Sequence, residues 1–107
     1  MSTRALLHAP ASARRGEVVE IRALIAHPME TGHRRDSDGR LLPRDLVRTL
    51  EARFDGELVF AAELHAAIAA NPYVAFHLRL PASGTLTVRW AGDRGFAHAE
   101  SVRIEAT

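Results

Sequence analysis

The 107-residue sequence contains no cysteine. This absence excludes disulfides, thiol nucleophiles and thiolate metal ligands within the chain. It also contains no lysine, so arginine supplies all 14 basic side chains, and its forked guanidinium suits carboxylates and interface ion pairs. No apolar run approaches membrane-spanning length. The first ten residues lack the apolar segment of a signal peptide, so we expect no signal peptide of its own.

Charge of one sign is also missing. The 14 basic residues are balanced by 13 acidic ones, giving a formal net charge of +1. This balance provides no general field to attract nucleic acid or an anionic membrane, and neither is expected as a partner. The apolar fraction of 47% and the charged fraction of 25% are ordinary for a globular protein. The length predicts a single domain, residues 1–107, with one core.

Alternation of apolar and polar residues is the dominant pattern, and a period of two is the period of a strand. It runs through residues 17–26, 50–55, 57–64, 73–80, 85–90 and 96–105, with a shorter stretch at 4–9. Turn signals separate these stretches at Asp55-Gly56, at residues 81–84 and at residues 92–95. The sequence therefore predicts an all-β protein, an immunoglobulin-like antiparallel β-sandwich of about seven strands.

One segment departs from this pattern. Residues 61–70 have high helix propensity, and Leu64 and Ile68 stand four residues apart. We expect the first half to be strand and the second half to be a loop or a single helical turn. Asn71-Pro72 closes the segment, because proline disfavours helix in the residue before it.

The richest chemistry lies in residues 27–36, which begin a long connection predicted to run from Pro28 to Arg44. His27, His33 and Glu30, with Asp36 or Asp38, have side chains that zinc accepts. However, there is no H-E-x-x-H motif, and Pro28 stiffens the chain between the histidines. We expect no metal site and no cofactor, although a histidine-based metal protein remains an open alternative.

Catalysis by this chain is not expected either. Ser83 and Ser101 are available hydroxyls, but Ser83 lies in a predicted turn and the sequence has no G-x-S-x-G motif. His77 alternates with Phe76 and Leu78 and is therefore predicted to point outward. Recognition is the remaining role for the long connection, with Met29, Arg34 and Arg35 as contacts suited to an interface.

Several segments together resemble the SoxZ family, whose members are small subunits of the SoxYZ thiosulfate-oxidation carrier complex. They are residues 16–22 (GEVVEIR), 27–32 (HPMETG), 34–36 (RRD), 43–44 (PR), 69–76 (AANPYVAF) and 83–90 (SGTLTVRW). The resemblance covers almost the whole chain, and the HPMETG and ANPY pieces in combination are specific. It implies an immunoglobulin-like sandwich, which agrees with the strand pattern.

The resemblance further implies a non-catalytic subunit that forms a heterodimer with a SoxY-like protein. In that family the SoxY chain carries the sulfur substrate on a cysteine in its flexible C-terminal arm, and the complex contacts other Sox pathway enzymes transiently. It also implies a periplasmic location, reached by co-export with a SoxY-like partner that carries the signal. The alternative is a stand-alone immunoglobulin-like module that binds a protein or a carbohydrate, without sulfur chemistry.

We predict two segments as the surface for the partner, its arm or the downstream enzymes. They contribute His27, Pro28, Met29, Glu30, Thr31, Gly32, Arg34, Arg35, Asp36, Asn71, Pro72 and Tyr73. Arg34 and Arg35 are expected to attract anionic sulfur adducts, because guanidinium groups pair well with sulfonate-like oxygens.

Overall fold

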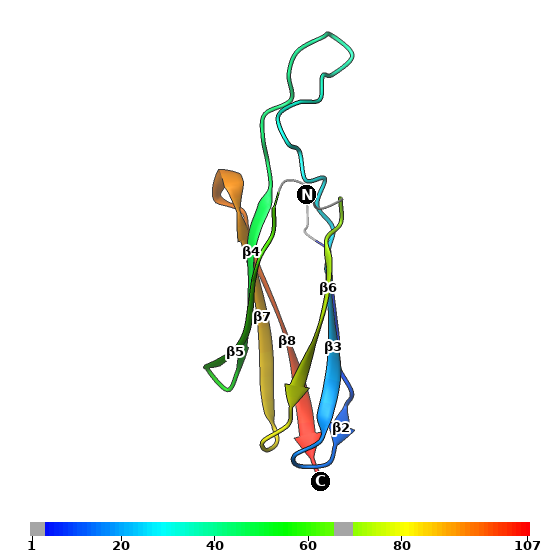
Figure 1. Cartoon of the computed structure of the whole chain (residues 1–107), viewed down its shortest axis with the longest axis vertical. Helices are drawn as coiled ribbons and strands as arrows, with labels where there is room; N and C mark the ends of the chain where they lie inside the picture. The colour runs from blue at the N-terminus through cyan, green and yellow to red at the C-terminus, as the bar shows by residue number, and fades with distance from the viewer. Residues whose placement is uncertain (1–3, 66–69) are drawn as a thin grey trace.

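The computed structural model describes residues 4–65 and 70–107. Within these residues the chain forms eight strands and one short 3-10 helix, η1 (Asp93–Gly95), as Figure 1 shows. The strands are β1 (Ala5–His8), β2 (Ser12–Ala13), β3 (Val18–Ile25), β4 (Val47–Phe54), β5 (Glu57–Glu63), β6 (Tyr73–Arg79), β7 (Gly84–Gly92) and β8 (Ala97–Ala106).

The strands form two sheets that face each other (Figure 1). One sheet has three strands in the order β1-β3-β6, and the other has five in the order β2-β8-β7-β4-β5. The predicted all-β sandwich is confirmed. Neighbouring strands are antiparallel except for β2, which pairs with β8 in parallel. β2 was missed in the sequence because two residues cannot show an alternation.

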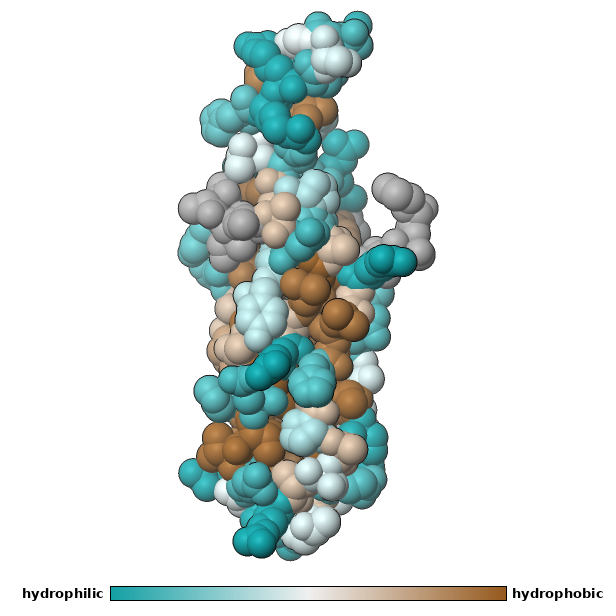
Figure 2. All heavy atoms as spheres, turned by 90° about the vertical axis from the view of Figure 1, so that its right-hand side faces the viewer, coloured by the Kyte–Doolittle hydropathy of each residue, from teal (hydrophilic) through white to brown (hydrophobic). Residues whose placement is uncertain are grey.

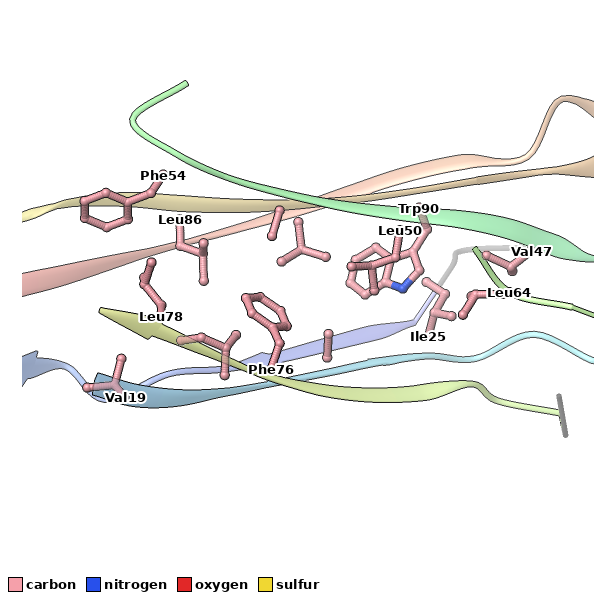
Figure 3. Close-up of a cluster of buried hydrophobic side chains, with 14 of the residues drawn as sticks. Val19, Ile25, Val47, Leu50, Phe54, Leu64, Phe76, Leu78, Leu86 and Trp90 are labelled. Atoms are coloured by element: carbon pink, nitrogen blue, oxygen red, sulfur yellow. The ribbon is translucent and has the colours of Figure 1, made fainter. Parts of the chain in front are cut away.

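The core lies between the sheets and follows the predicted alternation. Trp90 of β7 is its largest fully buried side chain, and Leu50 of β4 is likewise fully buried (Figure 3). The three-stranded sheet contributes the inward residues of β3 and β6, namely Val19, Ile21, Ala23, Ile25, Phe76 and Leu78. Burying a large apolar side chain stabilises the fold by about 1.5–3 kcal/mol relative to leaving it exposed. The alternating apolar residues therefore determine which face of each strand turns toward the core.

Two strand details differ from the prediction. β4 begins at Val47, three residues earlier than predicted. The sequence did not show this start, because a register irregularity between Val47 and Thr49 interrupts the alternation. A bulge in the β4–β5 pair lies where Ala52 is opposite Phe60 but the next residue, Arg53, is opposite Leu58. The extra residue turns Leu58 outward, where it is 48% exposed. The predicted loop or helical turn after β5 includes residues 66–69, which lie outside the described residues.

The described part of the chain is elongated, with extents of 57 × 25 × 19 Å. The connection between β3 and β4 causes much of this length, because it rises beyond one end of the sandwich (Figure 1). No helix among the described residues is long and apolar enough to cross a membrane.

Candidate interaction site

The structure brings together the two segments that the sequence predicted as the interaction surface. The backbone N–H of His27 donates to the Asn71 side-chain oxygen at 2.9 Å, and the N–H of Asn71 donates to the His27 carbonyl at 2.7 Å. Asn71 has a φ of 54°, a left-handed conformation that asparagine tolerates better than most residues. Asn71 therefore joins the start of β6 to the end of β3, although 44 residues separate it from His27.

The imidazole of His27 is buried at the base of the long connection, with 6% of the residue exposed. Its Nδ1 accepts the Met29 N–H at 3.0 Å, and its Nε2 lies 3.6 Å from the Asp45 carboxylate. The ring packs edge-on against Phe96 with centroids 5.0 Å apart. In residues 4–65 and 70–107, no group of three or more histidine, cysteine or acidic side chains could hold a metal ion.

Met29 is the second buried residue of this base. It is 5% exposed, and its thioether accepts the Val47 N–H at 3.3 Å. Its φ of 54° lies in the left-handed region, which is unfavourable for a side chain of this size. Burial in the core holds Met29 in this conformation, so the chain leaves β3 through a fixed bend.

Beyond this base the chain forms a projection that we call the finger, residues 33–43. Two backbone hydrogen bonds between Glu30 and Asp45, of 2.8 and 2.7 Å, close its lower end. At its tip the Asp36 carboxylate accepts the N–H groups of Asp38 and Arg40 at 2.9 and 3.0 Å. These hydrogen bonds satisfy backbone N–H groups of the turn within the finger itself. The finger is therefore ordered by its own hydrogen bonds rather than by packing on the core.

The two predicted anion-binding arginines differ in their contacts. The Arg34 guanidinium forms an ion pair with Glu30, and this hydrogen bond holds the pKa of the Glu30 carboxyl below its usual value. Arg35 donates to the Gly39 carbonyl at 2.7 Å, which is a neutral acceptor, and it forms no ion pair within residues 4–65 and 70–107. Arg35 is therefore the better placed of the two to attract an anion.

Asp93 of η1 supports the finger from the five-stranded sheet, a role that the sequence did not suggest beyond a turn. Its carboxylate accepts the Arg48 Nε–H at 2.6 Å and the Leu46 N–H at 3.1 Å. Arg44, next to the finger, has its Nε 3.7 Å from the same carboxylate. The hydrogen bond from Arg48, followed by that from the Leu46 backbone, lowers the pKa of Asp93.

Asp93→Asn is expected to lower the melting temperature at neutral pH more than in acid. A carboxyl whose pKa is lowered by folding stabilises the fold above its unfolded pKa, here 3.8, and this contribution is lost as the pH falls through the lower folded value. Thermal melts of both proteins at about pH 7 and about pH 3 measure the difference. A gap that stays constant across this range would contradict the assignment, and Asp38→Asn at the finger tip is the control.

The predicted surface residues divide by exposure. Three are buried in the chain, namely His27, Met29 and Pro72, and three are half-buried, namely Glu30, Thr31 and Gly32. The exposed ones are Pro28, Arg34, Arg35, Asp36, Asn71 and Tyr73. The buried side chains shape the site without being open to a partner. The role of the exposed residues in partner binding stays a prediction.

Comparison with known proteins identifies one family and a shared fold. Residues 7–103 match the model of the family described as "Sulphur oxidation protein SoxZ". No curated protein matches the sequence.

Several solved structures share the fold at low sequence identity. A superoxide reductase (neelaredoxin) from Ignicoccus hospitalis has a TM-score of 0.76 at 18% identity, covering 96% of this chain and 80% of that one. A putative superoxide reductase from Thermotoga maritima has a TM-score of 0.74 at 18% identity, covering 96% of this chain and 85% of that chain. The sulfur carrier protein SoxY from Chlorobium limicola has a TM-score of 0.66 at 13% identity, covering 96% of this chain and 78% of that chain. The immunoglobulin-like sandwich is thus confirmed, and at these identities the likeness shows the fold alone.

Proposed function

Because the chain belongs to the SoxZ family and is a subunit of a Sox sulfur-oxidation system, we propose that it is the non-catalytic half of a SoxYZ-type carrier complex. A SoxY-like partner would carry the sulfur substrate on its C-terminal cysteine, a residue that this chain lacks. The observation that carries the proposal is the family match across residues 7–103. We further propose that the complex acts in the periplasm, which this chain reaches together with its partner.

A supporting role rather than a catalytic one agrees with how the polar groups near the loop base are used. The His27 ring nitrogens face the Met29 N–H and the Asp45 carboxylate, and the imidazole is buried against Phe96. The Asp36 carboxylate caps the finger turn. These groups build the finger, and they are poorly placed to act as an acid or base on a substrate that approaches from solvent.

In this proposal the finger presents the loaded carrier to the enzymes that act on it. It is fixed at its base and exposed along its length, so it can reach a second protein without unfolding. Its arginine charge would attract anionic sulfur adducts and raise the rate of encounter.

Arg34→Ala/Arg35→Ala is expected to lower turnover of the reconstituted pathway about 3- to 10-fold while leaving the heterodimer folded, since exposed charges act mainly on association rates. Most of the loss should come from Arg35→Ala, because Arg34 is already paired with Glu30. Thiosulfate oxidation by the purified components measures the rate. Wild-type turnover in the double variant would refute the role of the arginines.

The function itself is tested by leaving the chain out. Thiosulfate oxidation by the purified pathway components should fall to background without this chain and return when it is added. Full turnover in its absence would favour the stand-alone binding module over the carrier subunit.

A further inference from the structure

Large apolar side chains form a row across the outer face of the three-stranded sheet. Leu6 of β1 lies opposite Leu24 of β3, and Leu24 lies opposite Tyr73 of β6. Leu6 is 67% exposed and Tyr73 is 58% exposed. Figure 2 views this face and shows hydrophobic atoms gathered at mid-height of the sandwich. An outward sheet face is normally polar, so a row of this kind marks a surface that another molecule covers.

The outer face of the five-stranded sheet has the opposite character. A hollow on it is lined by Glu51, Arg53, Thr87 and Arg89. The Thr87 hydroxyl also lies 2.9 Å from the hydroxyl of Ser101 on the neighbouring strand. On this face Leu58 is exposed on the edge strand β5, but the middle strands β4 and β7 present polar side chains. The two sides of the sandwich are therefore not equivalent, and the row across all three strands belongs to the three-stranded sheet.

The charged side chains on the apolar side are only partly paired within the chain. Glu20 and Arg22, adjacent to the row on β3, form an ion pair of 2.6 Å. Arg79 at the end of β6 donates to the Gly16 carbonyl at 2.7 Å. The pair nearest the row needs no countercharge from a partner, so an apolar sheet face is the best complement there, with an acidic group opposite Arg79 at the end of β6.

The size of the face indicates what kind of partner fits. β3 and β6 have eight and seven residues and β1 has four, so the sheet face has an area of roughly 300 Å². This is less than half of the ~800 Å² that a standard interface buries on each partner. A hollow beside the row extends the available surface around the β1 edge towards β8. It is lined by Arg4, Ala5, Leu6, Leu24, Ala26, Asn71 and Glu100.

A partner must therefore offer both a sheet face and additional chain to fill this hollow. The SoxY structure from Chlorobium limicola shares the fold, and 78% of that chain is covered, so it has additional residues that the present chain does not match. Within the described residues, a second copy of the present chain adds mainly the finger to the sandwich. The SoxY-like chain meets both requirements better.

We infer that the outer face of the three-stranded sheet, centred on Leu6, Leu24 and Tyr73, docks the SoxY-like chain sheet against sheet. The inference rests on the proposed function and adds to it the surface that forms the complex. In this arrangement the hollow at the β1 edge receives the part of the partner that lies outside its sandwich. The finger stays uncovered beyond the end of the sandwich, where it is accessible to other proteins.

The test is the affinity of the full-length chain for the purified SoxY-like partner by titration calorimetry. Leu6→Asp/Tyr73→Asp should weaken the dissociation constant at least about ten-fold, because charges would be buried in an apolar contact. Thr87→Asp on the opposite face and Leu41→Asp in the finger are matched controls, expected to bind within about two-fold of wild type. If the thermal melt of the double variant shows that it does not fold, Ala75→Arg takes its place, because Ala75 is exposed on the same face.

The outcomes separate the two levels of the proposal. Wild-type affinity in the folded face variants would overturn the docking surface while leaving the carrier function intact. Loss of self-association alone, with unchanged affinity for the partner, would assign the face to a second copy and would also overturn the inference. No binding by the wild-type chain would instead contradict the proposed function.

Discussion

Excising the finger is expected to leave a folded chain that still pairs with its partner but supports pathway turnover at least about ten-fold more slowly. The variant replaces residues 33–43 with Gly-Gly. Such a short turn can close the gap, because a β-carbon at Gly32 would lie 3.8 Å from the Arg44 Cα. No finger residue belongs to the buried core, so the sandwich should melt near the wild-type temperature.

The expected loss arises because the finger is the exposed, preformed element that we propose contacts the pathway enzymes. Thiosulfate oxidation by the reconstituted components measures turnover, and calorimetry with the SoxY-like partner measures pairing. Asp38→Asn, which keeps the finger and its length, is the control. Unchanged turnover would remove the finger from the functional site, whereas a lost heterodimer would move partner docking from the sheet face to the finger.

His27→Ala is expected to lower the free energy of unfolding by about 2–4 kcal/mol. The substitution leaves a cavity beside Phe96 and removes the acceptor of the buried Met29 N–H. His27→Asn is the matched variant, because its side-chain oxygen can take the place of Nδ1. It should recover about half of the loss, since the acceptor returns and the ring volume does not.

Urea unfolding of the three proteins measures these differences. Hydrogen exchange should also be faster at the Met29 amide in the alanine variant, because its hydrogen bond is gone. A change below about 0.5 kcal/mol for His27→Ala would show that the imidazole does not hold the base of the finger.

The sandwich was predictable because its evidence is local. Alternation in β3 assigns Ile21 and Ile25 to the core without any knowledge of the other strands, and a period of two admits few other structures. The bulge opposite Ala52 was not predictable, because it depends on the register of β4 against β5. Leu58 therefore points outward although its own strand gives no sign of it.

The site was predicted as a segment but not as an arrangement. Seven polar residues among positions 27–36 suggested a cluster of functional groups, whereas His27 is buried and Asp36 accepts hydrogen bonds from its own turn. The base of the connection is held by hydrogen bonds between residues that are far apart in the sequence. Asn71 accepts the His27 N–H, and Asp93 accepts the Leu46 N–H. The sequence resemblance linked the two segments as members of one family pattern, and the structure supplies the physical reason.

The apolar row illustrates the same limit. Leu24 and Tyr73 are each at outward positions in their strands, but only the register of three strands shows that Leu6 completes a row with them. A lone exposed apolar residue is ordinary on a protein surface. Three at one level form a feature that the sequence alone does not display.

The most direct test of the carrier assignment is native mass spectrometry of this chain mixed with its SoxY-like partner. The partner is first loaded with thiosulfate by the other pathway enzymes and an added electron acceptor, which takes up the two electrons released when the cysteine thiol and thiosulfate join. The account predicts a one-to-one heterodimer in which the added sulfur mass stays with the partner when the subunits are separated. Absence of a heterodimer at micromolar concentrations, or a sulfur adduct on this chain, would contradict it.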